Sequence, residues 1–268
     1  MRGLLIFLFL QACSYREPHL GDDGGPPPDM PHDSSAVRTR SQLIGAWAFD
    51  ETSGLVAHDT SGTGNPVDLT ASDVVMWSGN GTLTVMAQAP GIVVSSALGP
   101  HLDADCSSAH AVTLEAWVFP VSGAQGSASA PVVVAGLSSS VVSRNISILQ
   151  AGDHWLGRVR TNTTGTTYQD GTPDLLPLPG ETVVPEMTHI VLVADATVRA
   201  LYVNNVKVAD TPAEGPLGWD GGYKMVLANE PSLYRPWSGT FAMVALYDRA
   251  LTVDDIKGNY DAGPTATP

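Results

Sequence analysis

The glutamates of this chain are not spaced for two-carboxylate catalysis. Hydrolysis of a glycosidic bond uses two carboxyl groups about 5 to 10 Å apart, and residues i and i+2 on one strand face can supply them. Five glutamates spread over the chain have no acidic residue two positions away, namely Glu115, Glu181, Glu186, Glu214 and Glu230. The spacing therefore gives no pair of catalytic carboxylates.

Glu115 comes nearest to a catalytic setting, because it shares the face of an expected strand with Trp117. A single glutamate there is more often a hydrogen-bonded structural residue than an acid catalyst. His189 lies in another apolar strand and is expected in the core. The chain also lacks Gly-x-Ser-x-Gly, His-Glu-x-x-His and phosphate-loop motifs. We predict no enzymatic activity.

Arginine and aromatic side chains offer a second chemistry, ligand recognition. Arg158 and Arg160 share one face of an expected strand that Trp155 leads, and Arg144 lies just upstream. The candidate aromatic residues in or beside loops are Tyr168, Trp219, Tyr223, Tyr234 and Trp237. The alternative for the arginines is a solvated sheet face that neutralises nearby aspartates. Three other tryptophans, Trp47, Trp77 and Trp117, are expected to pack in the core.

The loop from Asp59 to Asp68 holds closely spaced oxygen ligands, with Asp59, Asn65 and Asp68 as candidates. Calcium takes six to eight such oxygens, including main-chain carbonyls. The loop therefore allows one structural calcium ion. We favour the alternative, a turn closed by hydrogen bonds from backbone N–H groups to the aspartate side chain.

The elements that must position these residues are short apolar segments separated by Gly, Pro, Asn, Asp and Ser, which is typical of an all-β sandwich or barrel. One of them, Val112–Phe119, alternates so that Leu114, Ala116 and Val118 share a face. The expected strands are Leu43–Phe49, Leu83–Met86, Ile92–Ser95, Val112–Phe119, Val132–Leu137, Ile146–Gln150, Trp155–Thr161, His189–Ala194, Ala200–Val203, Val206–Ala209, Lys224–Ala228 and Phe241–Tyr247.

The stretch Trp237–Tyr260 organises this pattern. Its apolar run Phe241–Tyr247 predicts a strand that is covered on at least one face and is expected to be covered on both. The polar residues Arg249–Asn259 that follow predict a short helix or turn. Unpaired apolar strands at opposite ends of a chain would expose edges that aggregate.

Five segments, in chain order, resemble those of the laminin-G-like, concanavalin A-like jelly-roll domains. They are Trp47–Asn65, Thr113–Pro120, Met187–Val191, Leu201–Val208 and Trp237–Tyr260. In the fourth segment the second turn position is Asn205 where relatives have Gly, and Asn also tolerates positive φ.

The resemblance implies an antiparallel two-sheet jelly-roll sandwich in which Leu43–Phe49 pairs antiparallel with Phe241–Tyr247. Related domains often hold a calcium ion with the opening-loop aspartate and an acidic residue early in the last strand. Ala242 and Met243 stand there in this chain, although Asp68 offers a substitute. The glucanases of this fold carry a Glu-x-Asp-x-Glu strand, which this chain lacks. The resemblance thus implies carbohydrate or protein recognition.

The N-terminal residues predict a targeting signal. Arg2 precedes the apolar run Leu4–Leu10, and Leu10–Cys13 resembles a bacterial lipobox in which Cys13 is lipidated. The alternative is an ordinary secretory signal with an incidental cysteine. Ser14 resembles the residue of lipoproteins sorted to the outer membrane. We expect a signal peptide at 1–12, a lipidated cysteine and disordered tether at 13–40, a jelly-roll domain at 41–262 and a disordered tail at 263–268.

Composition limits the partners. The 268 residues carry a formal net charge of −14, which argues against binding nucleic acid or anionic lipid surfaces. If Cys13 is lipidated, Cys106 has no partner for an internal disulfide and is expected as a buried thiol, with an intermolecular bridge as the alternative.

These observations predict a surface-anchored, non-catalytic recognition or adhesion module of the bacterial cell envelope. Its expected partner is a carbohydrate or an envelope or extracellular protein, and it touches the membrane only through the lipid. The alternatives are a glycan hydrolase or lyase on the same fold, and a purely structural envelope lipoprotein.

Overall fold

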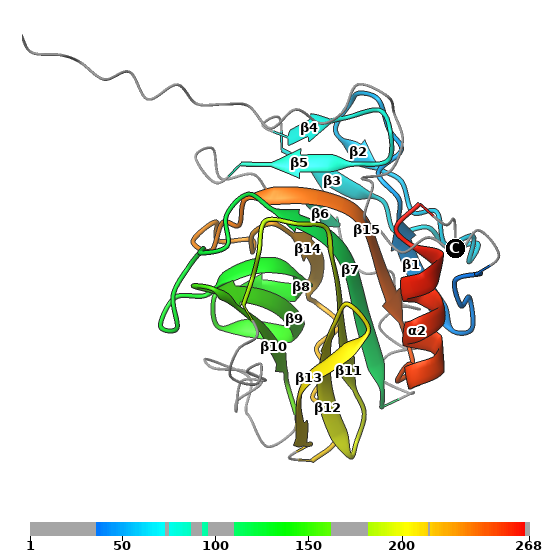
Figure 1. The fold of residues 1–268 in the computed structure, drawn as a ribbon, viewed down its shortest axis with the longest axis vertical. Helices are drawn as coiled ribbons and strands as arrows, with labels where there is room; N and C mark the ends of the chain where they lie inside the picture. Colours follow the sequence, from blue (N-terminus) through cyan, green and yellow to red (C-terminus); the bar gives the residue numbers. More distant parts are fainter. Residues whose placement is uncertain are drawn as a thin grey trace, which may run out of the picture. The chain divides into compact units, whose positions relative to one another are not determined.

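The computed structural model describes residues 36–72, 75–86, 93–95, 110–161, 182–213 and 215–265. The chain divides between Met30 and Pro31, and every described residue belongs to the second unit. This unit is built from strands in two antiparallel sheets, so the predicted all-β jelly-roll sandwich is confirmed (Figure 1).

The first sheet has eight strands. Its hydrogen-bonded order is β13 (Val206–Pro212), β12 (Val198–Val203), β11 (Thr188–Ala194), β7 (Val112–Pro120), β15 (Gly239–Tyr247), β5 (Leu83–Val85) and β4 (Val75–Trp77), and β1 (Leu43–Trp47) also pairs with β15. The second sheet has seven strands, in the order β10 (His154–Val159), β9 (Ser143–Ala151), β8 (Val132–Ser140), β14 (Lys224–Leu227), β6 (Val93–Ser95), β3 (Leu69–Ala71) and β2 (Val56–Ala57).

The predicted pairing of the first and last strands is confirmed. β1 runs antiparallel to β15, with Ala46 opposite Ala245 and Trp47 opposite Val244. β1 ends two residues before the predicted limit, because Phe49 has a φ of 54° and cannot continue an extended strand. β14 likewise stops before Ala228, whose φ is 63°.

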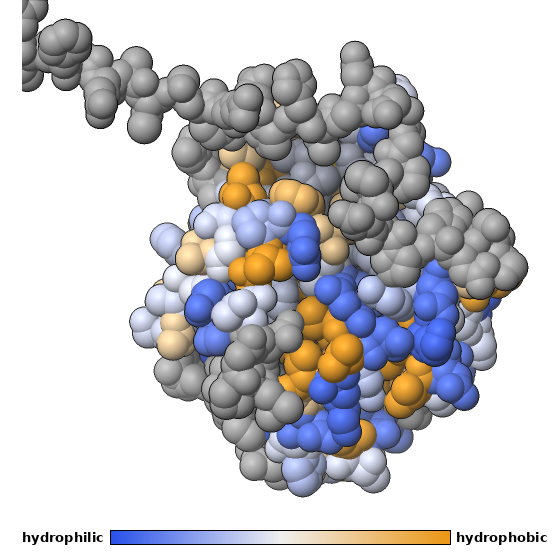
Figure 2. Space-filling model, viewed as in Figure 1, coloured by the Kyte–Doolittle hydropathy of each residue, from blue (hydrophilic) through white to orange (hydrophobic). Residues whose placement is uncertain are grey.

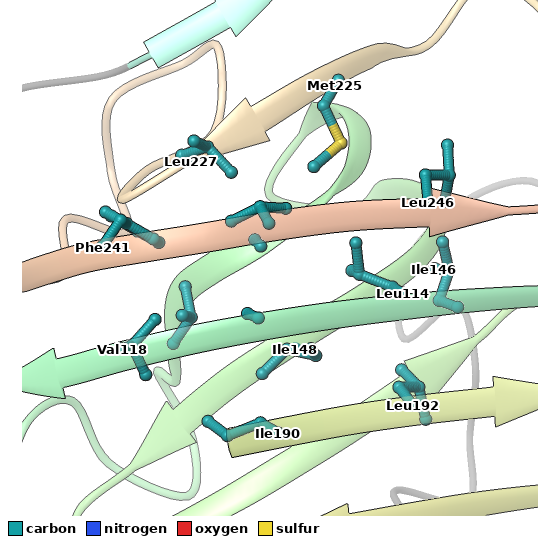
Figure 3. Close-up of a cluster of buried hydrophobic side chains, with 14 of the residues drawn as sticks. Leu114, Val118, Ile146, Ile148, Ile190, Leu192, Met225, Leu227, Phe241 and Leu246 are labelled. Carbon is teal, nitrogen blue, oxygen red and sulfur yellow. The ribbon is translucent and has the colours of Figure 1, made fainter. Parts of the chain in front are cut away.

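The core lies between the two sheets (Figure 3). The apolar side chains of β7, β11 and β15 point toward those of β9 and β14. As predicted, alternation along β7 places Leu114, Ala116 and Val118 in this core. The opposite face of β7 is buried as well, so Thr113, Glu115 and Trp117 need a second covering layer.

The helix α2 (Val253–Ala262) supplies part of that layer and lies beside β1 and the end of β15 (Figure 1). It begins at Thr252, whose side chain accepts from the Asp255 N–H while the Asp255 carboxylate accepts from the Thr252 N–H. The segment predicted as a short helix or turn is therefore a helix, which begins and ends a few residues later than predicted. Within the described residues, no helix has the length and apolarity that a bilayer crossing requires.

The folded domain extends beyond both of its predicted limits. Arg38, expected in the tether, is buried, and its guanidinium donates to the Glu115 carboxylate and to the Gly263 carbonyl. The Thr39 N–H donates to the Asn259 side chain. Gly263, expected in the tail, is buried too. Residues 36–40 were predicted as part of the tether from their composition. A buried ion pair helps to hold them on the domain, and such a contact leaves no apolar pattern in the sequence.

Candidate functional site

The loop between β14 and β15 is fixed from inside by two polar side chains. Asn229 and Glu230 are both 0% exposed. The Asn229 Oδ1 atom accepts from the backbone N–H groups of Glu230 and Arg235, each at 3.0 Å. One amide oxygen therefore ties together the two ends of the segment 230–235.

The Glu230 carboxylate holds the tip of the same loop. It accepts from the N–H of Ser232 at 2.8 Å and from the N–H of Tyr234 at 2.9 Å, and also from the Ser232 hydroxyl. Between them, Leu233 has a φ of 66°. Such a φ is rare for a branched side chain and persists only where surrounding contacts impose it. The tip is consequently a preorganised turn.

This rigid turn presents apolar side chains to solvent. Tyr234 is 77% exposed and Leu233 is 42% exposed. Among the phenylalanine, tyrosine and tryptophan side chains of the described residues, Tyr234 is the one that is exposed. The turn is also fastened to the sandwich, because the Val133 N–H donates to the Arg235 carbonyl at 3.0 Å. Fixed loops that display a tyrosine are common binding elements.

Elsewhere, exposed apolar side chains are scattered. On the face shown in Figure 2, the hydrophobic groups of the described residues lie among hydrophilic ones in several small clusters. Scattered apolar residues are normal on a soluble surface, whereas interaction sites tend to gather them. This face therefore offers no single broad apolar surface.

Of the predicted ligand-binding residues, four are buried. Trp155 and Trp237 are at most 1% exposed, and both belong to the core cluster. Arg144 and Arg160 are 3% and 7% exposed. Arg158 and Trp219 are half-buried. Trp155, Arg144 and Arg160 are thus not open to a ligand, because Trp155 packs in the core and both arginines are buried.

Arg160 belongs to a second group of polar residues. Its guanidinium donates to the Tyr223 hydroxyl at 3.4 Å and lies 5.9 Å from that ring's centroid. Asn145 joins the same region to Asp220 by two hydrogen bonds. This group lies near the start of β9, whereas the Tyr234 loop adjoins the start of β8, at the opposite end of the β8–β9 hairpin. The predicted residues thus fall into two separate regions.

Glu115 lies at the centre of a buried network under α2. Its carboxylate accepts from Arg38, from His189 at 2.8 Å and from Asn259 at 2.7 Å. Burial alone would raise the pKa of Glu115, but the Arg38 charge and the His189 hydrogen bond outweigh burial and lower the pKa to about 2. Burial lowers the pKa of His189. The predicted hydrogen-bonded role of Glu115 and the core position of His189 are confirmed.

Aromatic rings close this network from the side. Trp117 stacks on His189 with centroids 4.6 Å apart, and Tyr260 of α2 stacks on Trp117 at 5.7 Å. Because Glu115 and His189 are both 0% exposed, no substrate reaches them in this conformation. The arrangement holds α2 and residues 36–40 on the sheet.

The Asp59 carboxylate closes its own loop. One oxygen accepts from the N–H groups of Ala46 and Ser61, and the other accepts from the Val67 N–H. Asp68 accepts from the Asp59 N–H at 3.0 Å, and Asn65 is exposed. These contacts support the turn interpretation. Within the described ranges, no group of three or more His, Cys, Asp or Glu side chains is placed to hold a metal ion.

Several predicted residues lie outside the described residues, namely Cys13, Cys106, Tyr168, Glu181 and Glu214. Conversely, the loop-forming roles of Asn229 and Glu230 were not predicted. A signal for them exists, since Asn-Glu-Pro-Ser followed by Arg-Pro is rich in turn residues. The sequence does not reveal that both side chains turn inward.

Comparison with known proteins gives a family model and similar folds. Residues 97–257 match the model of the concanavalin A-like lectin/glucanases superfamily. No curated protein matches the chain. Among solved structures, Trypanosoma rangeli sialidase is 16% identical with a TM-score of 0.59, over 84% of this chain and 33% of that one.

The binding domain of botulinum neurotoxin DC is also similar. Its complex with SialylT is 9% identical, with a TM-score of 0.62, and the match covers 84% of this chain and 52% of that one. Its complex with rat synaptotagmin II is 8% identical, also with a TM-score of 0.62, over 83% of this chain and 52% of that one. The chain thus spans between a third and about half of these chains, and the likeness concerns the fold.

Proposed function

Because this chain belongs to the concanavalin A-like lectin/glucanase superfamily, we propose that its domain is a non-catalytic recognition module that binds carbohydrate at the loop 229–236. One observation carries the proposal: Tyr234 is 77% exposed on a turn that two buried side chains hold rigid. A flat aromatic ring fits the apolar face of a sugar. A fixed loop loses little conformational entropy on binding.

The proposal of a module without catalysis is supported by how two of the glutamates in the described residues are used. Glu115 and Glu230 are both 0% exposed, and their oxygens accept from donors inside the domain. An acid catalyst must reach the bond that it protonates. The proposal for carbohydrate draws further support from the neurotoxin domain of similar fold that was solved with SialylT.

We place the module at the surface of a bacterial cell envelope, held there by lipid on Cys13. Leu10–Cys13 supports this part of the proposal through its likeness to a lipobox. A lipid anchor of several acyl chains would hold the protein stably without a spanning helix.

A glycan array probed with the full-length protein and with Tyr234→Ala tests the function. We expect binding to at least one glycan class, weakened about tenfold or more in the variant, as for a central aromatic contact. Tyr202→Ala is the matched control, because Tyr202 is a half-buried tyrosine on β12. Binding that Tyr234→Ala leaves unchanged, or hydrolysis of the bound glycan, would overturn the proposal.

A further inference from the structure

The arginine next to Tyr234 is unusual in this protein because its guanidinium has no partner among the described residues. The arginines in the described ranges are Arg38, Arg40, Arg144, Arg158, Arg160, Arg199, Arg235 and Arg249. All except Arg235 have a side-chain interaction with the rest of the protein. Arg235 contributes only its backbone N–H and carbonyl to hydrogen bonds.

Those two backbone hydrogen bonds fix where the Arg235 side chain begins. The N–H donates to Asn229 inside the loop, and the carbonyl accepts from Val133 on β8. Tyr234 is the preceding residue, so the two Cα atoms are about 3.8 Å apart. An exposed aromatic ring and a half-buried guanidinium without a partner among the described residues therefore arise from adjacent positions on one rigid turn.

Among the described residues, the Arg235 side chain has no partner although the chain is rich in acidic groups. The chain carries 27 acidic and 13 basic side chains, so most cations find an acidic or carbonyl partner. The nearest buried acid along the chain, Glu230, does not pair with Arg235, because its oxygens accept from Ser232 and Tyr234. A guanidinium presents a planar set of donors that matches the oxygens of a carboxylate or a sulfate.

From this placement we infer that the tip formed by Leu233, Tyr234 and Arg235 binds an acidic sugar. The ring of the sugar lies on Tyr234, and its carboxylate or sulfate pairs with Arg235. The inference rests on the proposed carbohydrate function and narrows the ligand to anionic glycans. A neutral sugar would leave the guanidinium without a partner.

Equilibrium binding to four immobilised probes tests this assignment with the full-length protein: oligogalacturonate, a heparin oligosaccharide, neutral galactan and oligoglutamate. We expect binding to one or both acidic glycans, weaker binding to galactan and none to oligoglutamate. Arg235→Gln should weaken acidic-glycan binding about tenfold or more, the usual loss for a hydrogen bond to a charged group. Arg235→Lys keeps the charge but loses the planar donors, so it should restore only part of the affinity.

Lys207→Gln is the control for net charge. It removes one positive charge from the exposed edge strand β13, where Lys207 pairs with Asp210, and should leave binding unchanged. Equal losses in Lys207→Gln and Arg235→Gln would overturn the assignment in favour of general electrostatic attraction. Arg235-dependent binding of oligoglutamate alone would overturn it in favour of an acidic peptide.

The two proposals fail in different ways. Binding of galactan that depends on Tyr234 but not on Arg235 would overturn the acidic-sugar assignment and support the carbohydrate function. Absence of binding to any glycan would overturn both. Melting temperatures of Arg235→Gln and Arg235→Lys should match the parent protein, since the Arg235 side chain supports no contact among the described residues.

Discussion

Arg38→Met should destabilise the domain strongly, although Arg38 lies before the first strand. The side chains of Arg38 and Glu115 are each 0% exposed, and they form an ion pair within the buried network under α2. Removing one partner leaves a buried carboxylate without its counter-charge, which costs about 3 to 5 kcal/mol. In a domain of this size each kcal/mol lowers the melting temperature by about 2 to 4 °C. We expect a drop of roughly 6 to 20 °C at pH 7.

The effect should also depend on pH. In the parent protein the pKa of Glu115 is lowered from 4.5 to about 2. The ion pair therefore contributes fully above pH 4.5, and its contribution is lost as the pH falls from 4.5 toward 2. In Arg38→Met the Arg38 charge no longer lowers the pKa of Glu115, so we expect this pKa to rise and protonation to remove the unpaired charge at a higher pH. The stability gap between the two proteins should be widest at neutral pH and should narrow in acid.

Thermal unfolding followed by circular dichroism at pH 7 and near pH 3.5 measures both effects. Arg40→Met is the control, because Arg40 is exposed and donates to the Ser61 carbonyl; its loss should cost about 1 kcal/mol or less. A melting temperature of Arg38→Met no lower than that of Arg40→Met would refute the role of the ion pair. An equal stability gap between Arg38→Met and the parent protein at both pH values would refute it as well.

Three other perturbations address the loops and the N-terminus. Glu230→Gln should weaken glycan binding several-fold while the domain stays folded, because it loosens the turn that presents Tyr234; equilibrium binding beside a melting curve checks this. Asp59→Ala should lower the free energy of unfolding by about 2 to 4 kcal/mol, since three backbone N–H groups lose their acceptor, and EDTA should change the melting temperature little. A large EDTA effect that Asp59→Ala abolishes would instead indicate calcium. Cys13→Ser should move the protein out of the detergent phase in phase partitioning, and unchanged partitioning would count against lipidation.

The sequence predicted the apolar parts of the long strands, because these parts show their burial. The polar ends of β8 and β9 were missed, since three serines end β8 and Ser-Arg-Asn begins β9. β7, β11 and β15 lie where the pattern indicates. Among the short strands, β5 and β6 were predicted but β2, β3 and β4 were missed, since two or three residues show a period of two only weakly.

The site was harder to predict, because the sequence gives the type of each residue but not whether its side chain points to solvent or into the core. Tyr234 was correctly placed in a loop, yet Trp155 and Trp237, equally attractive as residue types, are core residues. Arg38 and Glu230 are charged side chains that became fully buried through contacts made far along the chain or within one turn. Patterns of hydrophobicity assign such residues to the surface.

The contacts of residues 38–42 also determine how the domain would carry mechanical force. A force applied to the chain before residue 36 acts first on Arg38 and Thr39. These two residues form hydrogen bonds with Glu115, Asn259 and Arg249. Only after these contacts yield does the load reach the pairing of β1 with β15. The last residues of the domain thus resist tension applied at its beginning. If the module is tethered by its N-terminal side as we propose, its resistance to a pull would depend on the contacts of α2 as well as on the binding loop.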